Sequence, residues 1–96
     1  MAVYKLSKAA KNDLAGIYEF GIETFGYNQA QLYLMQLHQH FLIMAENPSI
    51  GRDASEFSTG LRRSVYESHT IFYQPMDTGV FIVRVMGQSM DYRKHL

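Results

Sequence analysis

The sequence predicts one small α+β domain, residues 1–96, in which an N-terminal strand and a helical hairpin pack on one face of an antiparallel sheet (β-α-α-β-β-β). Two long segments in the first half carry apolar residues at three- and four-residue intervals, which is typical of amphipathic helices. Three apolar runs separated by short turns fill the second half and indicate a meander of strands. A length of 96 residues suits a single hydrophobic core.

The N-terminal elements are a short strand and a helix. Residues 3–6 form the expected strand, and Ser7 after them is a good helix N-cap. A helix is expected from about Lys8 to Thr24, because its apolar residues recur on one side. Gly26 favours a left-handed cap and therefore ends this helix.

The second helix is expected to run from Asn28 to near Asn47, where Pro48 forces the preceding residue out of helical geometry. The short loop makes the two helices antiparallel neighbours. Four apolar residues of this helix point away from its core stripe: Leu32, Met35, Leu42 and Ile43. Two interpretations remain open, which are burial under a loop or scattered exposure, and a surface that meets another chain.

Three strands are expected in the second half, at residues 61–66, 69–74 and 80–86. A tight turn at residues 67–68 joins the first two, and a longer turn at 75–79 joins the last two. The segment 48–60 is expected to be irregular. The tail 88–96 is too short for a substantial element.

The last strand is an almost unbroken apolar run, which favours a strand covered on both faces. Strict alternation of side chains places Ile82, Arg84 and Met86 on one face, with Phe72 or Tyr73 beside them. The helical hairpin can cover only the other face. We therefore expect a second protein to cover this face. The alternative is that the C-terminal tail and the loop before Leu61 fold over it.

Composition and motifs argue against most chemistry. Nine Lys and Arg balance nine Asp and Glu, so no direct sequence-specific binding of nucleic acid is expected. His38 and His40 point apart on a helix and cannot share a metal ion, and there is no cysteine or activated serine. We expect no cofactor and no metal. With no signal-peptide pattern and no bilayer-length apolar stretch, a cytoplasmic location is expected.

The remaining candidate is a group of cationic residues. Arg62 and Arg63 fall on opposite faces of their strand, so only one of them can join Arg84 across the sheet. Arg93, Lys94 and His95 approach if the tail folds back. Such a group could contact phosphates, acidic residues of a partner, or acidic residues of its own chain.

An ordered set of motifs resembles the RelE/ParE toxin superfamily, in its ParE branch, over almost the whole chain. The motifs are Leu6-Ser7, Ala9-Ala10, Asp13-Leu14, Ala45-Glu46-Asn47-Pro48, Gly51-Arg52, Gly60-Leu61-Arg62, Ile71-Phe72-Tyr73, Val83-Arg84-Val85 and Met90-Asp91. The resemblance implies the toxin of a bacterial type II toxin–antitoxin pair. It implies two partners: a partly disordered antitoxin that forms helix on binding, and DNA gyrase, which such toxins poison without chemistry of their own.

On this resemblance we assign two sets of binding residues and no catalytic residue. The expected target-binding residues are Arg62, Arg84, Met90, Asp91, Tyr92 and Arg93. The expected antitoxin-binding residues are Leu32, Met35, Leu42, Phe72, Tyr73, Ile82, Arg84 and Met86.

The alternative function is that of RelE-like relatives, which cut messenger RNA on the ribosome with basic residues and a C-terminal aromatic acid or base. Members of the superfamily often carry His and Arg between the last strand and the Met-Asp pair. Here those places resemble Gly87 and Ser89, which removes cations that a nuclease would use. Tyr92 and His95 are the only acid–base candidates in the tail.

Overall fold

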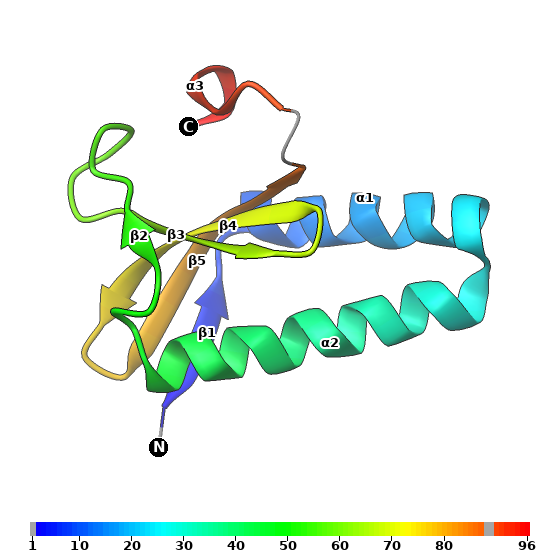
Figure 1. Ribbon diagram of the computed structural model, residues 1–96, viewed down its shortest axis with the longest axis horizontal. Coiled ribbons are helices and arrows are strands. Elements are labelled where there is room, and N and C mark those ends of the chain that lie inside the picture. The colour runs from blue at the N-terminus through cyan, green and yellow to red at the C-terminus, as the bar shows by residue number, and fades with distance from the viewer. Residues whose placement is uncertain (1, 88–89) are drawn as a thin grey trace.

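The computed structural model describes residues 2–87 and 90–96 and has the expected order of elements (Figure 1). Two short elements were not expected from the sequence: a two-residue strand in the segment 48–60 and a four-residue helix in the tail. The elements are β1 Val3–Leu6, α1 Lys8–Phe25, α2 Tyr27–Glu46, β2 Arg52–Asp53, β3 Arg62–Tyr66, β4 His69–Met76, β5 Gly79–Gly87 and α3 Tyr92–His95. The predicted α+β class is confirmed.

The five strands form one sheet in the order β1-β5-β4-β3-β2. Strands β3, β4 and β5 form the expected antiparallel meander, and β2 adds to it antiparallel to β3. Strand β1 pairs in parallel with β5, so the sheet is mixed. This pairing begins at Gly79, opposite Val3. Gly79 has a φ of 147°, and a Cβ there would lie 1.7 Å from the Val3 carbonyl oxygen, so only glycine allows the strands to meet.

Ser7 confirms the predicted start of α1 and also ties the helix to the sheet. Its hydroxyl accepts a hydrogen bond from the Ala10 amide at 2.9 Å and donates one to the Val83 carbonyl at 2.6 Å. Gly26, with a φ of 92°, ends α1 and begins α2. The two helices therefore turn back on each other and lie on the same side of the sheet (Figure 1).

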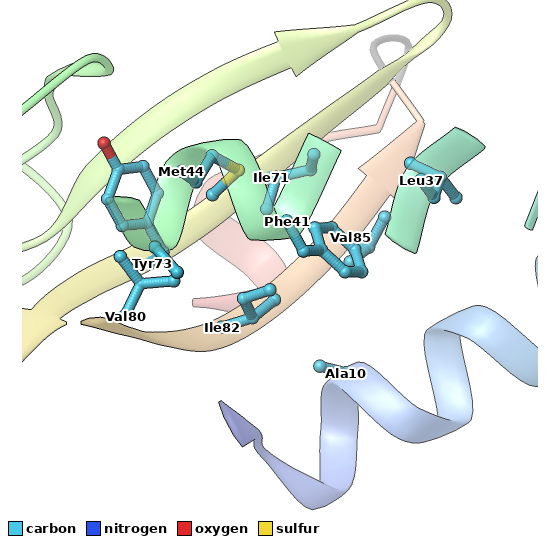
Figure 2. Close-up of a cluster of buried hydrophobic side chains, with 10 residues drawn as sticks. Ala10, Leu37, Phe41, Met44, Ile71, Tyr73, Val80, Ile82 and Val85 are labelled. Carbon is cyan, nitrogen blue, oxygen red and sulfur yellow. The ribbon is translucent and has the colours of Figure 1, made fainter. Parts of the chain in front are cut away.

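The main core lies between the helical hairpin and the sheet (Figure 2). Helix α2 contributes Leu37, Phe41 and Met44, each at most 1% exposed. Ile71 and Tyr73 face them from β4 and are fully buried. Burial of these large side chains supplies most of the driving force for folding.

A β-bulge changes the predicted faces of β5. The register shifts between Phe72, which pairs with Arg84, and Tyr73, which pairs with Ile82, so Val83 has no partner opposite it. An extra residue reverses the alternation of side chains beyond it. Ile82 therefore lies in the helix-covered core with Tyr73, and the prediction that Ile82, Arg84 and Met86 share one face is wrong.

The chain itself covers the part of the second face of the sheet around Phe72. Phe72 packs there with Ala54 and Leu61 from the segment after α2, and Phe57, Val83 and Tyr92 join this cluster. Phe72, Tyr73 and Ile82 are 0% exposed and Met86 is 1% exposed. The prediction that a second protein must cover these four side chains is therefore wrong, because the chain's own elements, loop and tail remove them from water.

Three histidines join α2 to the sheet through hydroxyl groups. His40 Nε2 lies 3.0 Å from the Ser64 hydroxyl, and His69 Nδ1 lies 2.6 Å from the Tyr33 hydroxyl. His38 pairs instead with Tyr4 of β1 at 2.5 Å. Burial lowers the pKa of His40 and of His69 below the ordinary value, because a charged imidazole loses hydration there.

These two pKa shifts predict that acid weakens the fold. Because the folded pKa values lie below the unfolded ones, stability is complete above the ordinary histidine pKa and is lost as pH falls through the folded values. We expect the midpoint of urea unfolding to fall between about pH 7 and pH 5. A His40→Gln/His69→Gln variant should show a shallower pH dependence, and an unchanged dependence would contradict the assignment.

Candidate functional site

Arg84 and Asp13 form the junction of α1, β5 and the tail. Arg84 Nε and Nη2 each donate a hydrogen bond of 2.8 Å to the Asp13 carboxylate, and the two side chains are only 18% and 14% exposed. Arg84 Nη1 donates to the His95 carbonyl at 2.9 Å. The Asp13 carboxylate also accepts the Val85 amide at 2.9 Å, beyond the point where β1 pairs with β5. All three guanidinium nitrogens are thus used within the chain.

The second anchor of the tail is Tyr92. Its hydroxyl shares a hydrogen bond of 2.9 Å with Thr70 of β4, and its ring centroid lies 5.0 Å from that of Phe72. Phe57 completes the aromatic cluster at 6.2 Å from Tyr92. Arg93 follows, with its guanidinium 5.6 Å from the centre of the Phe57 ring. Tyr92 therefore positions α3 on the sheet.

Met90, Asp91 and Arg93, which also belong to the predicted target-binding set, form the outward side of the tail. Asp91 caps α3 by accepting the Arg93 amide at 3.1 Å. Met90, Asp91 and Arg93 are exposed, whereas Tyr92 is half-buried. Ser89, which the resemblance to the superfamily singled out, lies outside the described residues. The structure thus divides the predicted tail residues into one anchor and three that solvent can reach.

Arg62 is separated from this junction. It lies opposite Tyr73 on the helix-covered side of the sheet, and its Nη2 donates to the carbonyls of Ser49 (3.0 Å) and Gly51. Tyr73 holds the same loop, because its hydroxyl donates to the Pro48 carbonyl at 2.8 Å and accepts the Gly51 amide at 2.9 Å. Arg62 therefore secures the connection after α2.

Arg63, rather than Arg62, shares the face of Arg84, and it lies directly opposite Arg52 of β2. Among the described residues neither the Arg52 nor the Arg63 side chain has an ion-pair or hydrogen-bond partner. Both line a hollow of about 550 Å³ that is also lined by Thr70 and Tyr92. Directly opposed like charges are unfavourable, so an anion would be stabilised there. Sequence reasoning did not identify this hollow, because β2 is too short to show a strand pattern.

The outward side of α2 keeps the apolar residues that the sequence analysis singled out. Leu32 is 48% exposed, Met35 60%, Leu42 37% and Ile43 49%. No residue between Glu23 and Glu46 is Asp, Glu, Lys or Arg. Burial of these residues under a loop is therefore wrong, scattered exposure agrees with these values, and a surface that meets another chain stays a prediction.

The described residues contain no group of three or more His, Asp or Glu side chains placed to hold a metal ion. His38 and His40 contact different elements, β1 and β3. No helix in the described part of the chain is both long and apolar enough to cross a membrane. The fold and its exposed features define a small α+β domain with candidate binding surfaces on α2 and on the tail.

Comparisons with known proteins identify the family. The family "ParE toxin of type II toxin-antitoxin system, parDE" matches residues 4–92. "Toxin ParE1" of Caulobacter vibrioides is 36% identical over 96 residues, which is 100% of this chain and 99% of that protein. "Toxin ParE1" of Mycobacterium tuberculosis H37Rv is 37% identical over 94 residues, 97% of this chain and 96% of the relative.

A solved structure from the "Chromosomal ParDE TA system from P. aeruginosa" shares the fold. Its TM-score is 0.76 at 17% identity, with 91% of this chain and 96% of that chain covered. The chain therefore belongs to the ParE toxin family of type II toxin–antitoxin systems, and the resemblance found from its motifs is confirmed.

The Arg84 junction predicts a large structural effect of one substitution. Arg84→Ala should lower the free energy of unfolding by about 1.5–3 kcal/mol, because it removes charge-assisted hydrogen bonds and leaves Asp13 only partly paired. Arg84→Lys should recover little of this, since lysine cannot form the paired bonds. Urea unfolding measures the effect. Arg63→Ala is the matched control and should change stability little; equal losses in the two alanine variants would refute the junction.

Proposed function

We propose that this chain stops growth by binding DNA gyrase through the outward side of its tail, and that gyrase performs the only covalent step. The observation that carries this proposal is that the two groups best suited to chemistry near the tail, Arg84 and Tyr92, are both engaged in holding α3 against the sheet. A tail held in this way presents a fixed shape to a partner.

The proposed contact residues are Met90, Asp91 and Arg93, while Arg84 and Tyr92 act as positioning residues. Met90 offers apolar contact and Arg93 offers a planar cation, and both types of residue are enriched in protein interfaces. Arg62 is omitted from the proposed contact surface, because its guanidinium binds the chain's own carbonyl groups.

A gyrase supercoiling and DNA-cleavage assay with purified components tests this surface. Arg93→Ala should weaken inhibition by about fivefold or more, since truncating an interface arginine typically costs ~1 kcal/mol or more. Arg52→Ala removes the same charge from a different surface and should inhibit like the parent chain. Equal potency of the Arg93 and Arg52 variants would count against the tail surface, and no inhibition by the parent chain would refute the gyrase proposal.

We further propose that the antitoxin lays a helical segment along the outward side of α2, over Leu32, Met35 and Leu42. The proposed antitoxin surface does not include Phe72, Tyr73, Ile82 or Met86, because these side chains are buried in this chain. Arg84 also leaves it, because its nitrogens are occupied. The support for α2 is an exposed apolar stripe on a helix whose opposite side is buried in the core.

One observation favours the alternative function, a RelE-like endonuclease that cuts messenger RNA on the ribosome. The hollow beside β3 is lined by Tyr92 and by two arginines without partners among the described residues, and these residue types could protonate and bind a phosphodiester. Cleavage also requires a base, and the Tyr92 hydroxyl is bonded to Thr70 rather than to an ionisable group. We therefore place this function second.

Tyr92→Phe separates the two functions, because it keeps the ring that positions α3 and removes only the hydroxyl. Under gyrase poisoning, the variant should remain toxic and should first stop DNA synthesis in pulse-labelled cells. Under ribosome-dependent cleavage, it should lose most activity, since removing a general acid typically costs about 10²–10⁴-fold. If the parent chain stops translation early and the Tyr92→Phe variant does not, the chain is an endonuclease instead.

A further inference from the structure

The outward side of α2 has the spacing of a coiled-coil seam. Positions 28, 32, 35, 39, 42 and 46 follow each other at intervals of four and three, the a/d pattern of a heptad, and all six are exposed. They carry Asn28, Leu32, Met35, Gln39, Leu42 and Glu46. Three of the six are apolar and two are uncharged amides, so Glu46 is the only charged residue of the seam.

This seam is complementary to itself when two copies run antiparallel. A twofold axis level with Leu37 places Leu32 opposite Leu42 of the second copy, and Met35 opposite Gln39. The same axis places Glu46 opposite Asn28, in the first turn of the facing helix. A carboxylate is stabilised there, because the N-terminal end of a helix is electropositive.

A parallel arrangement fits less well. It would bring Glu46 against Glu46 of the second copy, and like charges that face each other across a seam are destabilising. The remaining outward residues of α2 offer no charge repulsion, since Glu46 is the only Asp, Glu, Lys or Arg of the helix. Depletion of charge is typical of the centre of a protein interface, whereas a helix kept only in water usually carries charges on its outer side.

Helix α2 is rigidly presented for such a contact. Its inner side is held by Leu37, Phe41 and Met44, each at most 1% exposed. In Figure 1 the start of β1 extends past the C-terminal end of α2 on the side away from α1, and the rest of α2 has no described element on that side. A second helix can therefore approach without displacing any described part of this chain.

We propose that two copies of this chain pair through α2, antiparallel, along the seam of Leu32, Met35, Gln39 and Leu42. The inference concerns the chain alone and does not depend on the gyrase target. The proposed dimer uses the same surface of α2 as the antitoxin segment proposed above, so the antitoxin would displace the second copy on binding.

Sedimentation velocity over a concentration series tests the proposal with two matched double variants. Leu32→Glu/Leu42→Glu places two introduced carboxylates opposite each other, whereas Leu32→Glu/Leu42→Lys places an introduced carboxylate opposite an introduced ammonium group and removes the same apolar side chains. We expect the parent chain to dimerise, the Glu/Glu variant to remain monomeric, and the Glu/Lys variant to dimerise at least about tenfold more tightly than the Glu/Glu variant. All substitutions are at exposed positions, and circular dichroism verifies that the helix content is retained.

Ile50→Glu is the surface control, because Ile50 is 54% exposed and lies after α2. It should dimerise like the parent chain. A parent chain that stays monomeric at every concentration would overturn the proposal even if it inhibits gyrase and binds its antitoxin. Dimerisation of the parent with both double variants equally impaired would overturn the antiparallel register, and dimerisation of the Glu/Glu variant would overturn the surface.

Discussion

The Asp13 carboxylate is the group on which the rest of this architecture depends. It pairs with the Arg84 guanidinium through two bonds and accepts the Val85 amide from the part of β5 that β1 does not reach. One side chain of α1 thus balances the charge of Arg84 and also accepts a backbone amide that has no partner strand. Arg84 then reaches the His95 carbonyl, so the position of the tail follows from the same contact.

This junction changes the interpretation of the arginine in the last strand. Sequence alternation places Arg84 on an uncovered face, where it would be available to a partner. In the structure its charge is neutralised by Asp13, and its hydrogen-bonding capacity is used within the chain. The cations without partners among the described residues instead include Arg52 and Arg63, which face each other at the other end of the sheet. These two arginines therefore form a cationic group beside β3 that is separate from the charged residues of the tail.

The exposed surface divides between two elements of different character. Helix α2 presents apolar and amide side chains with almost no charge, whereas the tail presents Asp91, Arg93 and Lys94. An apolar helix surface suits contact with another helix, because its affinity comes from excluding water. A charged, aromatic-anchored tail suits an oriented contact with a larger partner. These differences give one small domain two separate candidate binding surfaces.

The amino-acid sequence predicted the order of the longer elements, the helix boundaries at Ser7 and Gly26, the outward apolar residues of α2 and the family, because periodicity, capping and ordered motifs are local properties. It did not determine which residues share a face in β5, because the bulge at Val83 arises from pairing with β4 and reverses the alternation. Nor did it show that the loop and the tail cover Phe72, or that Asp13 meets Arg84 from 71 residues away. Those outcomes depend on contacts between distant parts of the chain, which local sequence patterns do not encode.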